Sequence, residues 1–205
     1  MPKNILLAAF MLTTLSVVNA QGPSFGLKGG LNFSSLDVES DDQKGRLGFN
    51  AGIFGRTDAE QPLGLQVELL YSTKGSSAEY TTFFGLVDQT VDFKLNYLEL
   101  PVMLAFRPVE ILDIHVGGYA GYLLSAQVET SGDLGSGSED LDADHFQRID
   151  AGLVVGAGLN LGPAQIGARY LYGLTELADS EEARAVLGNA KNACVQAYVA
   201  FGLGR

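Results

Sequence analysis

The chain has 205 residues, a mass of 21.7 kDa and a formal net charge of −11, a length that suits one domain or two small ones. The acidic balance argues against nucleic acid as a partner, because phosphate binding needs clustered lysine and arginine side chains. The only cysteine is Cys194, so an intramolecular disulfide is excluded.

The first residues have the pattern of a secretory signal peptide. Lys3 supplies a positive start, residues 5–18 are apolar, and Ala20 closes a group of small residues at the usual cleavage spacing. We therefore expect residues 1–20 to be a signal peptide and residues 21–205 to form one domain; a retained amphipathic anchor is the alternative. After Ala20 no apolar run reaches the roughly 20 residues that a membrane-spanning helix needs, which excludes a helical membrane protein.

Apolar and small or polar residues alternate with a period of two along the remaining chain, which is typical of strands with two unlike faces. We expect about eight strands, at residues 25–33, 47–53, 63–71, 98–106, 112–124, 149–159, 164–173 and 195–203. Before the fourth of these, the apolar residues from Val91 to Tyr97 occupy odd positions, whereas the apolar face resumes at even positions from Leu98. This change of phase predicts a β-bulge near Tyr97.

The connections between these strands alternate in length. Those at residues 58–62, 107–110 and 161–163 are short, and those at residues 37–46, 76–89, 128–147 and 177–191 are long and polar. Short turns at one end and long loops at the other are typical of outer-membrane barrels. The pattern predicts an all-β fold: an eight-stranded antiparallel up-and-down transmembrane β-barrel with short periplasmic turns and long extracellular loops.

The two faces of the strands differ in a way that decides which of them points outward. The apolar face holds too many bulky side chains for the interior of an eight-stranded barrel, which side chains of modest size already fill. The other face is rich in glycine and carries most of the charges, and a lysine or arginine facing lipid near the midplane costs about 2–4 kcal/mol. We therefore expect the apolar face to contact lipid and the glycine-rich face to line the lumen.

Five ionisable residues of the inner face fall at similar heights along the predicted barrel: Lys28, Glu68, Glu99, His115 and Arg169. Buried charges need partners, since removing one partner leaves an uncompensated charge at a cost of about 3–5 kcal/mol. We expect these residues to form an ion-pair network that plugs the lumen, with a structural role. Replacing Glu99 with leucine should then lower the melting temperature in detergent micelles.

Six segments of the chain resemble, in order, the outer-membrane β-barrel proteins of the PorT-like family. They are FGLKGGLNFSSL (residues 25–36), LGLQVELLYSTKG (63–75), LNYLELPVMLAF (95–106), GGYAGYLLSA (117–126), GLVVGAGLNL (152–161) and IGARYLYGLTEL (166–177). The resemblance implies an eight-stranded barrel in the outer membrane of a Gram-negative cell and brings no catalytic residues. It also implies insertion by the barrel-assembly machinery, for which such chains usually end on an aromatic residue; here Phe201 is the nearest candidate.

Several segments could carry chemistry, and each has a plainer interpretation. His115 beside Asp113 could act in acid–base catalysis, but general-acid work needs a substrate within hydrogen-bond reach. The acidic run SEDLDAD (residues 138–144) offers oxygen ligands for calcium but lacks the glycine and final glutamate of an EF-hand loop. Residues 179–191 could form a short helix. We expect no catalytic residues, no metal site and no cofactor.

Two classes of function remain open on this evidence. The first is an integral outer-membrane barrel, not an enzyme, with a structural or interaction role and possibly a link to protein secretion or envelope assembly. The alternative is a small-solute pore or a barrel-embedded enzyme that acts on envelope lipid. The expected partners are outer-membrane lipid, the barrel-assembly machinery during insertion and an unidentified envelope protein.

Overall fold

The computed structural model describes residues 24–37, 44–57, 62–82, 87–132, 137–141, 147–176 and 191–204. Nine strands lie within these ranges: β1 (Ser24–Asp37), β2 (Lys44–Arg56), β3 (Leu63–Thr82), β4 (Val87–Val109), β5 (Leu112–Gly132), β6 (Gly137–Leu141), β7 (Ile149–Leu161), β8 (Ala164–Glu176) and β9 (Lys191–Gly204). The expected signal peptide and the expected helix at residues 179–191 fall outside the described ranges, the latter except for Lys191. Within the described ranges, no helix has the length and hydropathy of a membrane span.

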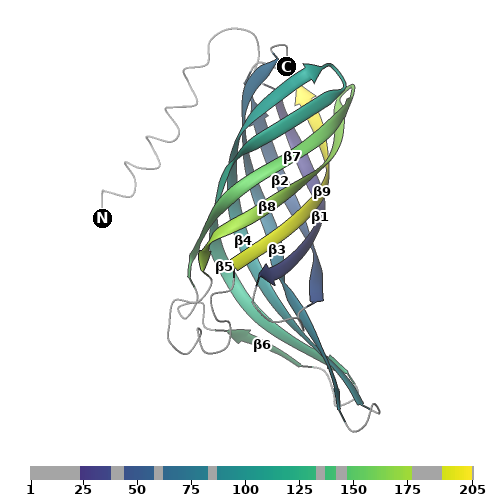
Figure 1. The fold of residues 1–205 in the computed structure, drawn as a ribbon, viewed down its shortest axis with the longest axis vertical. Coiled ribbons are helices and arrows are strands. Elements are labelled where there is room, and N and C mark those ends of the chain that lie inside the picture. The colour runs from purple at the N-terminus through teal and green to yellow at the C-terminus, as the bar shows by residue number, and fades with distance from the viewer. Residues whose placement is uncertain are drawn as a thin grey trace, which may run out of the picture.

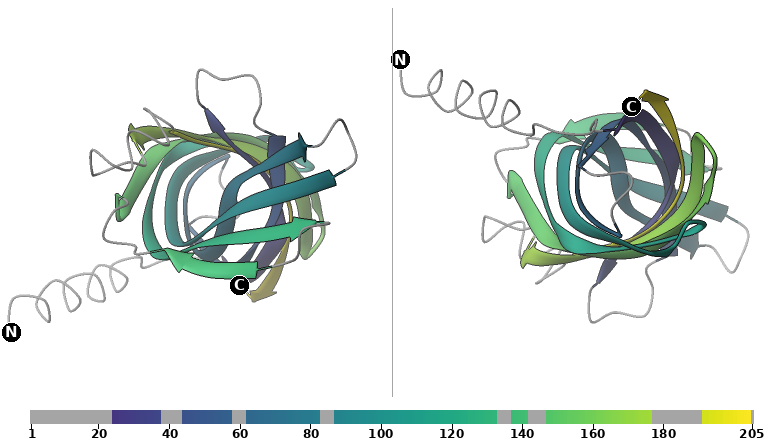
Figure 2. Two further views of the ribbon diagram at one scale, coloured as in Figure 1. Left: turned by 90° about the horizontal axis from the view of Figure 1, so that it is seen from below. Right: turned by 90° about the horizontal axis from the view of Figure 1, so that it is seen from above.

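Eight of the strands close into a barrel, as predicted. Each strand pairs antiparallel with its neighbours in the order β4-β3-β2-β1-β9-β8-β7-β5, and an additional β4–β5 pairing closes the ring. Seen along its axis, the ring is continuous from both ends (Figure 2). The first and last strands lie side by side, from Phe25 opposite Gly204 to Asp37 opposite Lys191. The barrel is therefore a single closed unit with no free edge in its wall.

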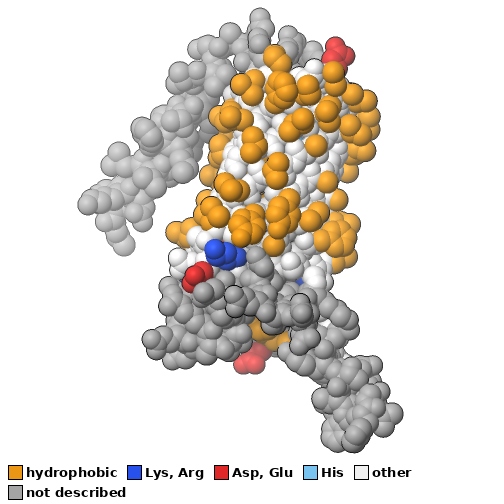
Figure 3. Space-filling model, viewed as in Figure 1, with side chains coloured by type: hydrophobic (Ala, Val, Ile, Leu, Met, Phe, Trp, Pro, Cys, Tyr) orange, Lys and Arg blue, Asp and Glu red, His pale blue; other side chains and the backbone are white. Residues whose placement is uncertain are grey.

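The large apolar side chains cover the outer wall of this barrel. Outward residues such as Leu27, Val116 and Val199 are more than half exposed, whereas their inward neighbours Lys28 and His115 are buried. Apolar side chains accordingly spread over the visible wall in Figure 3. In a soluble protein that surface would be in contact with water, where so many exposed apolar side chains are unfavourable. Its composition is instead typical of a wall that contacts lipid.

Aromatic side chains mark the two ends of the apolar wall. Phe25, Phe106 and Phe201 are exposed beside the short turns, and Tyr71 and Tyr122 flank Leu98 toward the long connections. Such girdles are typical of the two membrane–water interfaces of an outer-membrane barrel. They place the lipid boundary between the transmembrane wall and the projecting parts of the strands.

Several strands continue beyond the barrel at the end opposite the C-terminus, where the sequence predicted loops (Figure 1). β3 and β4 form a long hairpin that closes with Thr82 opposite Val87, through most of the connection expected at residues 76–89. β6 lies in the connection expected at residues 128–147 and pairs with β5. Outside lipid a strand needs no apolar face, so the polar composition of these segments concealed their pairing.

The β-bulge lies where the sequence predicted it along β4, but the extra residue belongs to β5. Asn96 is opposite Ser125 and Tyr97 is opposite Leu123, so Leu124 is the inserted residue. In β4 itself, Leu95 and Tyr97 are buried on the same side as Glu99. The phase change read from β4 was therefore wrong: Leu95 and Tyr97 face the lumen, and no residue is inserted in β4.

Candidate functional site

Three of the five predicted network residues form one buried ion cluster in the lumen. Lys28 Nζ of β1 donates to Glu68 Oε1 of β3 at 2.7 Å, and Arg169 Nη1 of β8 donates to Glu68 Oε2 at 2.7 Å. Gln66 Nε2 also donates to Glu68 Oε1 at 2.6 Å, and Arg169 Nε donates to Gln196 Oε1 at 2.6 Å. Glu68 of β3 thus bridges two cations from β1 and β8, and β8 lies across the barrel from β3. We call this set the Glu68 cluster.

His115 lies beside the Glu68 cluster, on the side of the short turns. Its Nε2 is 3.4 Å from the hydroxyl of Tyr198, and its Nδ1 is 3.8 Å from Asp113 Oδ1. Asp113 Oδ2 accepts a hydrogen bond from Arg56 and is 3.5 Å from Arg107 Nη2. Arg56 and Asp113 were not among the five residues predicted for the network.

Glu99 lies apart from the other four predicted residues. Its Oε1 is 2.5 Å from Lys74 Nζ, which is also 3.3 Å from Asp150 Oδ2. Asp150 accepts further hydrogen bonds from Tyr119 and Asn192. The expectation of a single network is thus replaced by two, and we call the second the Lys74 cluster. Lys74 has the same parity as Glu68 in β3, so alternation could have placed it in the lumen.

An apolar layer separates the two clusters. It consists of Met103, Tyr119, Val154, Leu171 and Cys194, each of which is at most 5% exposed. Met103 Sδ is 4.0 Å from Arg169 Nη1, and the hydroxyl of Tyr119 donates to Asp150 of the Lys74 cluster at 3.2 Å. The lumen is therefore filled at this level by side chains packed between two sets of ion pairs.

Glycines of the inner face make room for the aromatic rings of the lumen. Five glycines face four aromatic side chains, and a β-carbon built on each would lie between 2.3 and 3.4 Å from the ring or its hydroxyl: Gly26 at Phe54, Gly121 at Tyr97, Gly152 at Tyr119, and Gly158 and Gly167 at Tyr198. Tyr198 in turn supports the Glu68 cluster, since Lys28 Nζ is 3.6 Å from its ring centroid. At these five positions glycine thus lets the rings pack closely against the wall.

Substitution of these glycines should have graded effects. In Gly167→Ala the new methyl would lie 2.5 Å from both Ala157 O and the hydroxyl of Tyr198, whereas in Gly121→Ala its nearest contact is 3.4 Å away, at Tyr97. We expect Gly167→Ala to lower the free energy of unfolding by about 1–3 kcal/mol through overpacking. Gly121→Ala should change it by less than about 1 kcal/mol. Urea titration of both variants in micelles would measure this difference, and equal losses would contradict it.

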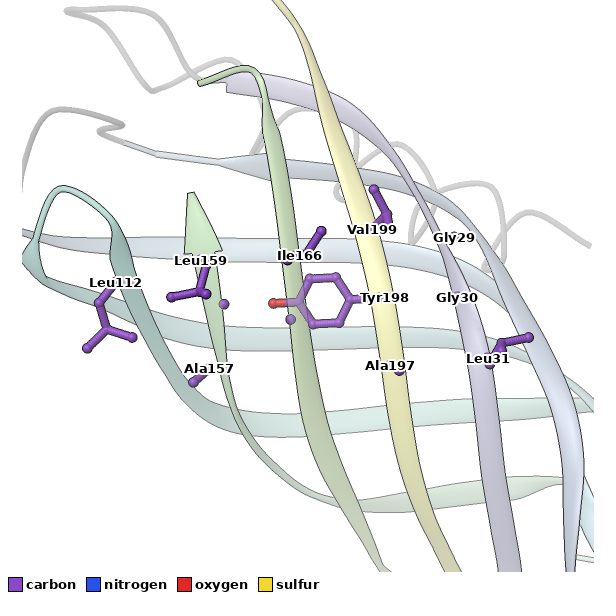
Figure 4. Close-up of a pocket in the computed structure, with 12 residues that line it drawn as sticks. Gly29, Gly30, Leu31, Leu112, Ala157, Leu159, Ile166, Ala197, Tyr198 and Val199 are labelled. Atoms are coloured by element: carbon purple, nitrogen blue, oxygen red, sulfur yellow. The ribbon is translucent and has the colours of Figure 1, made fainter. Parts of the chain in front are cut away.

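The outer wall bears a shallow apolar groove of about 580 Å³ across β1, β9, β8 and β7. Figure 4 shows Leu31, Val199, Ile166 and Leu159 along it, with Tyr198 extending from β9 toward β8. Small residues, among them Gly29, Ala157 and Ala197, form its base. The groove lies within the wall that contacts lipid, so its apolar lining matches its surroundings.

A second cavity of about 880 Å³ opens at the end of the barrel that carries the short turns. His115 lines neither cavity and is 1% exposed. General-acid or general-base work requires a substrate within hydrogen-bond reach, and the nearest polar group to His115 Nε2 is the buried hydroxyl of Tyr198.

Among the described residues no group of three or more acidic, histidine or cysteine side chains could hold a metal ion. In the acidic run at residues 138–144, the structure describes the side chains of Ser138, Glu139 and Leu141, and the other positions lie outside the described side chains.

Comparison with known proteins agrees with this architecture. The family described as "Outer membrane protein beta-barrel domain" matches residues 19–179. The crystal structure of Ail, the attachment invasion locus protein of Yersinia pestis, in complex with the heparin analogue sucrose octasulfate is 16% identical, with a TM-score of 0.50 over 89% of this chain and 100% of that one. Neisserial surface protein A is also 16% identical, with a TM-score of 0.48 over 90% of this chain and 99% of that one.

No curated protein matches the sequence significantly. The likeness to Ail is a likeness of fold, because the sequence identity is low. The family match covers well over half of the chain, and the closed barrel with its apolar outer wall agrees with a location in the Gram-negative outer membrane. The chain belongs to the outer membrane protein β-barrel domain family.

Proposed function

We propose that this protein is a non-conducting, non-enzymatic barrel whose role is structural or is carried by the parts that project from the membrane. The apolar layer of Met103, Tyr119, Val154, Leu171 and Cys194 is the observation that carries this proposal. A pore needs a continuous water-filled path, and side chains occupy the lumen between the Glu68 cluster and the Lys74 cluster. The PorT-like sequence pattern further suggests a place in protein secretion or envelope assembly.

The projecting sheet of β3, β4, β5 and β6 supports an interaction role. Within the described residues β6 pairs only with β5, through residues such as Glu139 opposite Val128. An unpaired strand edge can accept a strand from a partner. The connections on this side include acidic runs such as SEDLDAD, so a partner with a basic surface is favoured. The sucrose octasulfate bound to Ail is an anion, so it is not the kind of partner that these acidic runs favour.

Single-channel recording in planar bilayers tests the proposal. We expect no steady conductance from the wild-type protein, because ions cannot cross the packed apolar layer. The variant Leu171→Ala shortens a fully buried side chain of that layer and should produce brief openings if the layer is the seal. Steady ion current through the wild type would contradict the proposal and favour a small-solute pore. Turnover in lipid hydrolase, acyltransferase or protease assays would favour an enzyme instead.

A further inference from the structure

The cavity at the short-turn end forms a vestibule that opens toward the periplasm. Its polar lining residues include Arg56, Gln66, Arg107, Glu110, Asn160 and Gln165. Its volume of about 880 Å³ lies within the range of small-molecule sites, which is roughly 300–1,000 Å³. Two arginines and three amide side chains give this vestibule a polar lining.

The Asn160 amide ties together the two turns that frame one side of the vestibule. Asn160 Nδ2 donates to the carbonyl of Glu110 at 3.1 Å, and its backbone N–H donates to the carbonyl of Ile111 at 2.8 Å. Gln165 Nε2 donates to Asn160 Oδ1 at 2.9 Å. The rim is therefore built from hydrogen-bonded groups and is already formed without a ligand.

Three basic side chains, those of Lys28, Arg56 and Arg169, and two acidic ones, those of Glu68 and Asp113, lie beneath the vestibule. All five residues are at most 4% exposed. A nearby anion is attracted to the basic groups on this side of the lumen.

The guanidinium of Arg56 supplies donors for such an anion. Its Nη1 donates to Asp113 Oδ2, while its Nε and Nη2 have no hydrogen-bond partner in the described part of the chain. These two nitrogens form the edge on which a guanidinium binds an oxyanion through two parallel hydrogen bonds. Gly64 lies beside this edge, since a β-carbon built on Gly64 would be 3.5 Å from Nε.

We propose that the vestibule binds a periplasmic oxyanion, a phosphate or a carboxylate, on the Nε and Nη2 edge of Arg56. Both nitrogens are covered in the unliganded structure, so a turn of the Arg56 side chain toward the vestibule accompanies binding. Arg107 contributes further positive charge at the rim, and the carboxylate of Glu110 disfavours anions that extend past it. The site therefore selects a compact anionic group.

Titration calorimetry with inorganic phosphate on the folded wild-type protein in a zwitterionic detergent tests this site. We expect saturable binding at one site and a matching rise in the melting temperature with phosphate concentration. Arg56→Lys keeps a cation beside Asp113 but lacks the two-pronged edge, so affinity should fall about tenfold or more, the worth of one lost charge-assisted hydrogen bond. Heat-modifiable migration on gels verifies that the variant is folded.

Arg46→Lys is the control, since Arg46 lies at the opposite end of the lumen, away from the vestibule, where its Nη1 donates to the backbone carbonyl of Lys74 at 3.3 Å. It should leave phosphate affinity unchanged. Absence of saturable binding of both phosphate and acetate, or equal weakening by the two substitutions, would overturn the proposal. In vesicles, competition by phosphatidylglycerol against phosphate would identify a lipid headgroup as the natural source; undiminished phosphate binding would identify a soluble anion.

Discussion

Replacing Glu68 with glutamine should destabilise the barrel more than any other single charge removal in the lumen. Glu68 is the one carboxylate that contacts both Lys28 and Arg169, each through a bond of 2.7 Å. Glutamine has nearly the same shape, so the packing is preserved while two buried cations lose their counter-charge. We expect the free energy of unfolding in detergent to fall by about 3–5 kcal/mol.

Two further substitutions of the same kind provide controls for this experiment. Glu99→Gln leaves Lys74 with Asp150 at 3.3 Å, so its loss should be smaller, about 1–3 kcal/mol. Glu129→Gln removes an ion pair with Lys94 that is partly exposed, and its effect should stay below about 1 kcal/mol. Urea titrations of the three variants should rank them in that order. Losses of equal size would show that the Glu68 cluster has no special role.

Alternation in the sequence was sufficient to find the eight strands of the barrel and most of the side chains that face its lumen, with Leu95 and Tyr97 of β4 as exceptions. Membrane strands show it strongly because lipid and lumen impose opposite requirements on successive residues. The same parity placed Lys28, Glu68 and Arg169 inside, where they meet. The fold was therefore predictable wherever both faces of a strand are constrained.

The partners within the lumen were not predictable in the same way. Parity assigns a residue to a face, but the stagger between tilted strands decides its height, and the sequence does not state that stagger. Glu99 therefore lies with Lys74 and Asp150 rather than with Glu68. Beyond the membrane even parity fails, because both faces of β6 and of the β3–β4 hairpin can be polar. The unpartnered edge of Arg56 likewise depends on geometry that no sequence pattern reports.

Replacing Val199 with arginine should be among the most damaging changes on the outer wall. Val199 is the middle one of the outward residues of β9 from Val195 to Leu203 and is 54% exposed. Within the hydrocarbon region an arginine on the lipid face costs up to about 2–4 kcal/mol, because its charge leaves water for hydrocarbon. We expect a loss of this size in the free energy of unfolding in lipid vesicles, measured by guanidinium titration.

Depth in the membrane separates this effect from a general intolerance of substitution. Leu203 is also outward and is 63% exposed, but it lies at the short-turn end of β9 beside the interface. Leu203→Arg can extend its guanidinium to water and should cost at most about 1 kcal/mol. If both variants lost stability equally in vesicles, depth would not matter and the apolar wall would not be in contact with hydrocarbon. A large loss in the free energy of unfolding for Val199→Arg, beside a small loss for Leu203→Arg, would assign the cost to lipid contact along β9.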